Sequence, residues 1–211
     1  MAHPPGSELP KTRTEAFSDG VIAIIVTILV LEVKVPRIEG PDLDAQLRHA
    51  MLHALPVVGA YLLSFLVLLV FWVAHHHLLH TMRRVDRNVL WLNGVFLMLL
   101  ALVPVPTALI GEYPSARSGS VLYGAALAAA GLAFVALRAY VTRHGGLLHE
   151  AIPAAAARQA VRKGLLSPVL YGTGAVVALV EPRAAWAIYA LVPLVYMWPG
   201  RFDRAARTLD D

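Results

Sequence analysis

The sequence predicts an all-α membrane protein with six transmembrane helices per chain, and three observations carry this prediction. Of the 211 residues, 58% are hydrophobic and only 15% are charged, which is far from the composition of a soluble domain. The apolar residues fall into six stretches separated by polar connections. Lysine and arginine gather on alternate connections, as they do on the cytoplasmic side of membrane proteins.

The first predicted helix covers residues 12–35. Thr12 and Glu15 have the spacing of a capping box, and Pro36 disfavours helix at the residue before it. At 1.5 Å per residue this helix would be about 36 Å long, enough to cross a bilayer. Residues 1–11 hold two adjacent prolines and no apolar run, so we predict a disordered cytoplasmic tail there.

Five further spans follow, predicted at about residues 49–74, 89–110, 121–141, 165–180 and 184–198. Pro56 should kink the second span, and Gly124 and Gly131 should allow close packing of the fourth. Residues 154–161 could form a short interfacial helix. The six spans make one domain of residues 12–199, and the charged residues 200–211 form a second tail.

The basic residues orient this domain in the membrane. Thirteen of the eighteen lysines and arginines lie on the segments that share a side with the two termini, and five lie on the other side. The positive-inside rule therefore predicts that both termini are cytoplasmic.

The first helix has one apolar stripe with a single hydroxyl. At 100° per residue one face carries Phe17, Gly20, Val21, Ile24, Thr27, Ile28 and Leu31. Asp19 points roughly the opposite way, at membrane depth, where a carboxylate must be paired or hydrated. Either Asp19 belongs to a functional site, or it ties this helix to a neighbouring helix.

The remaining polar residues have simpler readings. His76 and His80 are four residues apart, so a metal pair is geometrically possible, but we favour helix-end histidines and predict no metal site. Asn93 is expected to bond a neighbouring helix. Arg83, Arg84 and Arg87 flank spans, so they indicate topology and not nucleic-acid binding.

The opening of the first helix resembles the signature of the transmembrane protein 175 family of potassium channels. The matching residues are R-x-x-x-F-S-D at Arg13, Phe17, Ser18 and Asp19, followed by G-V-x-A-I-x-x-T ending at Thr27. Trp-x-x-His-His after the second span and Leu-Trp-Leu-Asn in the third also resemble the family pattern. These landmarks extend the resemblance over most of the chain.

The resemblance implies a homotetrameric potassium channel in which the first helix of each chain lines a central pore. It implies Ile24 as the main constriction, Ile28 and Leu31 further along the pore, and Thr27 as the selectivity hydroxyl. It also implies a network that holds the first helix, drawn from Arg13, Phe17, Ser18, Asp19, Trp72, His75 and His76. Potassium would be the permeant ion, with no cofactor and no small-molecule substrate. The expected location is the plasma (inner) membrane of a prokaryote.

Two other functions are also compatible with parts of this sequence. A proton-coupled secondary transporter could use Asp19 and the histidines from His75 to His80 as a proton relay, but no inverted repeat is visible. A structural membrane protein without transport would fit most of the composition. An enzyme is not expected, because no phosphate-binding loop, H-E-x-x-H motif or catalytic triad signature is present.

Overall fold

The computed structural model describes residues 11–35, 37–39, 41–144 and 146–197, and this part of the chain is helical, without strands. The prediction of an all-α fold is confirmed. The predicted tails lie outside the described residues except for Lys11, which begins the first helix. The elements are α1 (Lys11–Ile28), the 3-10 helix η1 (Leu29–Glu32), α2 (Leu43–His80), α3 (Arg87–Ala101), α4 (Pro104–Glu112), α5 (Arg117–Arg143), α6 (Ala154–Gly164), α7 (Leu166–Ala178) and α8 (Pro182–Tyr196).

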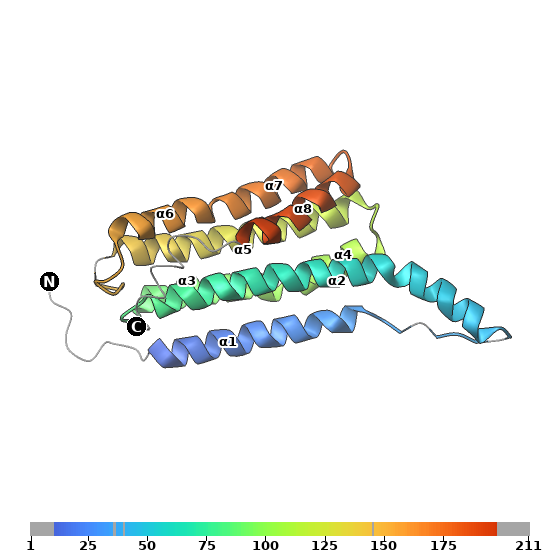
Figure 1. The fold of residues 1–211 in the computed structure, drawn as a ribbon, viewed down its shortest axis with the longest axis horizontal. Helices are drawn as coiled ribbons and strands as arrows, with labels where there is room; N and C mark the ends of the chain where they lie inside the picture. The colour runs from blue at the N-terminus through green and yellow to red at the C-terminus, as the bar shows by residue number, and fades with distance from the viewer. Residues whose placement is uncertain (1–10, 36, 40, 145, 198–211) are drawn as a thin grey trace.

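Four helical segments are long and apolar enough to cross a membrane. They are Lys11–Glu32, Leu43–His80, Arg87–Glu112 and Arg117–Arg143. α7 and α8 are shorter, with 13 and 15 residues. α6 and α7 are separated only by Leu165 and run in line beside α5 (Figure 1). The predicted interfacial helix is therefore the first part of one long helical rod.

The structure moves several boundaries relative to the predicted spans. α1 continues into η1 and ends at Glu32, before Pro36. α2 begins at Leu43, six residues before the predicted span, and its first turns extend beyond the other helices (Figure 1). Pro56 lies inside α2, and the helix changes direction where it joins the bundle. The third predicted span is divided into α3 and α4 ahead of Pro104 and Pro106.

The helices pack around a core that α5 organises. α5 contacts α3 and α4 on one side and α6, α7 and α8 on the other. α1 lies at the edge of the bundle and packs against α2 and α3 (Figure 1). The rings of Phe71, Phe96 and Phe134 meet at the centre, joining α2, α3 and α5. The edge position of α1 leaves one of its long faces uncovered.

Small residues let α5 approach α7 and α8 closely, as the sequence predicts. A Cβ atom added to Gly124 would meet the Tyr189 hydroxyl and the Tyr171 carbonyl oxygen. A Cβ atom at Gly131 would lie 3.2 Å from the Cδ atom of Pro168. Helices in lipid associate through such close backbone packing, so these glycines hold the second half of the bundle together.

The connection between α2 and α3 is hydrogen-bonded to the connection between α5 and α6, at the end of the bundle where α1 begins. The Arg83 N–H donates to the Leu147 carbonyl at 2.8 Å, and the His149 N–H donates to the Thr81 carbonyl at 3.0 Å. Asp86 then caps α3, accepting from the Val89 N–H at 2.8 Å. These bonds fix the start of α3, and α3 carries the amide that reaches α1.

Candidate functional site

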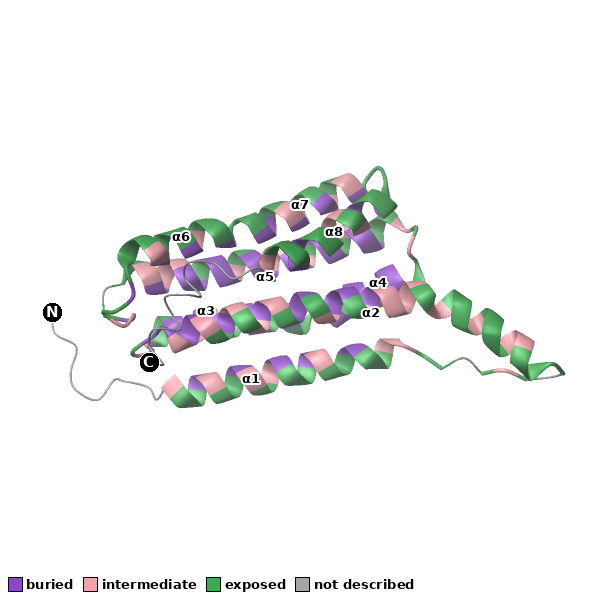
Figure 2. Ribbon diagram, in the orientation of Figure 1, coloured by how far each residue is buried: buried purple, intermediate pink, exposed green. Residues whose placement is uncertain are grey.

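α1 presents two different faces, and only one of them packs against the rest of the chain. The packed face consists of Thr14, Ser18, Ile22, Ile25 and Leu29, all buried. The opposite face is exposed and contains Phe17, Gly20, Ile24, Thr27, Ile28 and Leu31. Figure 2 shows this division along the helix. Ile24 is 59% exposed and Leu31 is 70% exposed, whereas Ile22 and Ile25 are 2% and 4% exposed.

The exposed face coincides with the stripe predicted from helical angles. Six of its seven predicted residues are exposed, and Val21 is half-buried. From Gly20 to Leu31 the only polar side chain on this face is that of Thr27. Its hydroxyl donates to the Ile24 carbonyl at 2.8 Å. Because the proton is used in this bond, the lone pairs of the oxygen are left to face outward.

A buried chain of hydrogen bonds anchors the packed face of α1. His75 on α2 bonds Asn93 on α3, with 2.7 Å between His75 Nε2 and Asn93 Oδ1. Asn93 Nδ2 donates to Ser18 Oγ on α1 at 2.8 Å, and Ser18 Oγ donates to the Thr14 carbonyl at 2.8 Å. His75, Asn93 and Ser18 are all buried.

The hydrogen bonds from His75 through Asn93 and Ser18 to Thr14 all run in one direction from donor to acceptor. Asn93 uses its amide nitrogen on Ser18, so its oxygen accepts and His75 Nε2 must carry a proton. At each of these contacts a donor therefore faces an acceptor. Buried polar groups are costly when unpaired, so the chain favours one rotation of α1 about its axis over the others.

Asp19 forms a second anchor beside the first. Trp72 Nε1 on α2 donates to Asp19 Oδ1 at 2.9 Å. The exposed ring of His76 lies beside Trp72, with 5.7 Å between ring centroids. Asp19 therefore makes a polar contact to α2 from the side of α1 away from Ile24, which favours the structural reading of this carboxylate.

The structure brings together four of the seven residues predicted for the network: Ser18, Asp19, Trp72 and His75. Of the other three, Phe17 is 62% exposed and lies on the uncovered face, Arg13 is also exposed, and the exposed ring of His76 lies at the edge of this group beside Trp72. Asn93, which the sequence predicts to bond a neighbouring helix, is not among the predicted site residues. It is the central member, since it alone joins His75 to Ser18.

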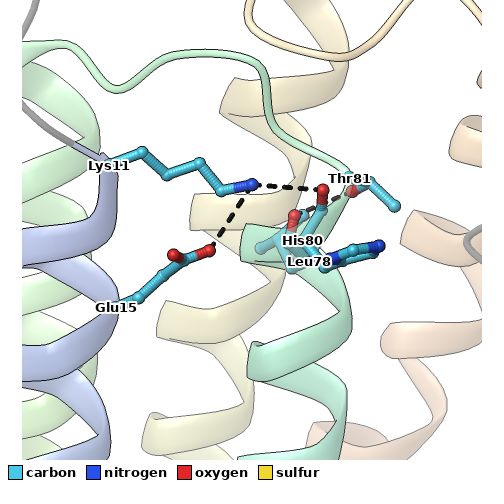
Figure 3. Close-up of polar contacts among 5 residues, drawn as sticks. All are labelled: Lys11, Glu15, Leu78, His80 and Thr81. Carbon is cyan, nitrogen blue, oxygen red and sulfur yellow. Dashed lines mark hydrogen bonds and ion pairs between the residues drawn. The ribbon is translucent and has the colours of Figure 1, made fainter. Parts of the chain in front are cut away.

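Lys11 and Glu15 hold the start of α1 in place, and neither is among the predicted site residues. Lys11 Nζ lies 3.5 Å from Glu15 Oε1 and donates to the His80 carbonyl at 3.3 Å, so it ties the start of α1 to the end of α2 (Figure 3). Next to His80, the Thr81 hydroxyl donates to the Leu78 carbonyl at 2.7 Å. The spacing of Lys11 and Glu15 is a sequence signal for a helical ion pair, but it does not reveal the partner on α2.

Arg138 on α5 is hydrogen-bonded to both α2 and α6. Its guanidinium donates to the Ala74 carbonyl and the Ala160 carbonyl, each at 3.3 Å, and lies 4.7 Å from the centroid of the Phe134 ring. Ala74 precedes His75, so a buried cation on α5 supports the backbone that carries the network. A basic residue near the end of a predicted span is the only signal the sequence offers for this contact.

The described residues hold no cluster of three or more histidine, cysteine, aspartate or glutamate side chains with the spacing of a metal site. Within the histidine group from His75 to His80, His75 is committed to Asn93 and His76 lies beside Trp72. The site therefore consists of an uncovered apolar face with one hydroxyl, held in place by polar bonds on the opposite side of the same helix.

Such a site defines a class: helical membrane proteins in which a polar network orients an uncovered apolar helix. The family model described as endosomal/lysosomal potassium channel TMEM175 matches residues 13–104, which include α1 from Arg13 onward and the hydrogen-bonded residues Ser18, Asp19, Trp72, His75 and Asn93. A potassium channel of Streptomyces collinus is 38% identical over 188 residues, covering 87% of this chain and 90% of that protein. A potassium channel of a Chryseobacterium species is 35% identical, covering 92% and 95%.

A solved structure of the same family also matches this fold. The crystal structure of a lysosomal potassium-selective channel TMEM175 homologue from Chamaesiphon minutus superposes with a TM-score of 0.77 and 30% sequence identity. The match covers 89% of this chain and 96% of that one. The chain belongs to the TMEM175 family.

Proposed function

We propose that this chain forms a potassium channel whose pore is lined by the exposed face of α1. The observation that carries the proposal is the division of α1 into an uncovered stripe containing Ile24, Thr27, Ile28 and Leu31 and a packed face anchored by Ser18 and Asp19. A helix that only faced lipid would not need two polar anchors to fix its rotation. The relatives named above, which are potassium channels, support the same assignment.

One such stripe cannot enclose an ion path, so several copies must surround a common axis. Closed rings are the usual solution for identical chains. We propose a homotetramer, with α1 of each chain at the centre. The edge position of α1 in the bundle supports this arrangement, because the exposed face can reach a neighbouring copy without any change in the fold.

The aliphatic residues are proposed to form the gate. Rings of Ile24, Ile28 and Leu31 side chains would exclude water and block ions by dewetting. Ile24 is the main constriction in this proposal. Opening requires the rings to widen, either by rotation of the side chains or by separation of the helices.

Thr27 is proposed to select for potassium. Its hydroxyl proton bonds the Ile24 carbonyl, so the oxygen can offer lone pairs to a cation in the pore. Four such oxygens would replace part of the hydration shell of potassium. Without a rigid carbonyl filter, discrimination between potassium and sodium should be modest.

We further propose that six segments cross the plasma (inner) membrane of a prokaryote, with α6 and α7 serving as one rod and α8 as the last crossing. Both termini lie in the cytoplasm. The C-terminal ends of α2 and α5 and the start of α6 lie at the end of the bundle where α1 begins (Figure 1). Arg83 and Arg84 follow α2, Arg143 ends α5, and α6 carries three more basic residues, so the basic residues support this orientation.

The experiment that tests the channel is a potassium flux assay on the full chain in liposomes. Flux should follow the potassium gradient without a second solute, and Ile24→Asn should raise it by wetting the constriction. Leu132→Asn is the matched control, since Leu132 is 54% exposed but lies on α5. Flux that requires a coupled proton gradient would instead favour the transporter alternative, which gains no support from relatives that are named as channels.

A further inference from the structure

The first turns of α2 form an arm that extends beyond the bundle (Figure 1). Asp42 caps its start, and the Asp42 Oδ1 atom accepts from the Ala45 N–H at 3.4 Å. His49 and His53 lie one helical turn apart on this arm, and both are exposed. Neither residue belongs to the α1 network.

The two imidazoles face each other. His49 Nε2 and His53 Nε2 are 3.2 Å apart, and the ring centroids are 4.3 Å apart with an angle of 57° between the ring planes. A tetrahedral metal with zinc–nitrogen bonds of about 2.0–2.1 Å places two nitrogen ligands about 3.3 Å apart. The pair therefore already has the separation that one shared metal ion requires.

We propose that His49 and His53 bind one divalent transition-metal ion of the class that prefers imidazole, with Zn²⁺ as the tetrahedral case. Both ligands are Nε2 atoms, and water completes the coordination shell. The ion would bridge two successive turns and hold this part of the arm helical. A site with two protein ligands and an open surface should exchange its metal readily.

The charge around the pair does not oppose a cation. From Arg37 to His53, both included, the sequence has three carboxylates and two arginines. The alternative reading is a hydrogen bond between two neutral rings, which would need a proton on one Nε2 atom. Such a bond on an exposed helix competes with water and contributes little to stability.

The test is a calorimetric titration of ZnCl2 into the full chain in detergent, purified without a polyhistidine tag. The wild type should bind about one zinc ion per chain at the arm, and His49→Ala and His53→Ala should each weaken that site by about tenfold or more. His144→Ala removes another exposed histidine and should leave the site unchanged. Size-exclusion profiles check that every variant keeps its assembly.

The proposal is overturned if both arm variants bind zinc as the wild type does, or if only one of the two histidines matters. It is also overturned if His76→Ala, and not the arm variants, removes the site, because the ion would then bind at the other end of α2. The titration needs no current, so its result is independent of whether the chain conducts potassium.

Discussion

Thr27 is the one side chain on the exposed face of α1, from Gly20 to Leu31, that can offer an oxygen to a cation. Its neighbours on this face are glycine and aliphatic residues, which cannot replace water around an ion. In the proposed pore we therefore expect this hydroxyl to be the side chain of α1 that coordinates a cation, and we expect Ile24, Ile28 and Leu31 to control access.

Thr27→Val removes the oxygen and keeps the branched shape of the side chain. We expect a tetramer of unchanged size whose permeability ratio of potassium to sodium falls severalfold, because the hydroxyl ring is lost while the pore width is kept. Reversal potentials under bi-ionic conditions measure this ratio. Thr12→Val, also exposed on α1 but outside the stripe, serves as the control. An unchanged ratio in Thr27→Val would remove Thr27 from the selectivity site.

Asn93 is the central residue of the hydrogen-bonded series that joins α1 to α2 through α3. Asn93→Ala breaks the bonds to Ser18 and His75 and leaves buried polar groups unpaired, which should cost about 1–3 kcal/mol. The thermal midpoint of the detergent-solubilised protein measures the loss. In a double-mutant cycle with Ser18→Ala the two effects should be non-additive. Fully additive effects would mean that the hydrogen bond between Asn93 and Ser18 contributes nothing.

At the scale of elements, close packing of α5 against α7 and α8 is the clearest constraint. Gly124→Val places side-chain atoms where the Tyr189 hydroxyl and the Tyr171 carbonyl already lie, so overpacking should destabilise the bundle by about 1–3 kcal/mol. Gly172→Ala on α7 is the control, since an added Cβ there meets nothing within 4 Å. Thermal midpoints of the two variants give the comparison. Equal midpoints would show that the helices can separate without cost.

The sequence predicts which face of α1 is apolar, but it does not predict which residues of other helices contact α1. The stripe of α1 follows from helical angles alone, because the 3.6-residue period fixes which side chains share a face. The partners of Ser18 and Asp19 do not follow, because Asn93 and Trp72 lie 75 and 53 residues away and meet them only after the helices pack. Apolar composition likewise cannot show that α6 continues into α7 or that α2 begins with an exposed arm.

At the scale of the whole molecule, the proposed topology places both termini in the cytoplasm. The chain has no cysteine, so single cysteines report their own side of the membrane. In intact cells a membrane-impermeant maleimide should label Glu39→Cys, and it should label Gln159→Cys only after permeabilisation. Both positions are exposed, and neither removes a basic residue. The reverse pattern would place the termini outside the cell.

The proposed assembly is a tetramer. Native mass spectrometry of the detergent-solubilised chain should show four copies, because one helix per subunit is too little to surround an ion path. Ile24→Asn should keep this number, since the substitution changes the inner surface of the ring and not the buried face of α1. A monomer that still conducts would contradict the shared pore.

The most direct measurement is the block of current by a positively charged methanethiosulfonate reagent in a channel carrying Leu31→Cys. Leu31 is 70% exposed at the end of the stripe, so the cysteine should react and the attached charge should stop potassium current. Leu132→Cys on α5 should leave the current unchanged. If the reagent labels Leu31→Cys without effect on the current, or if Leu132→Cys is blocked equally, α1 does not line the pore.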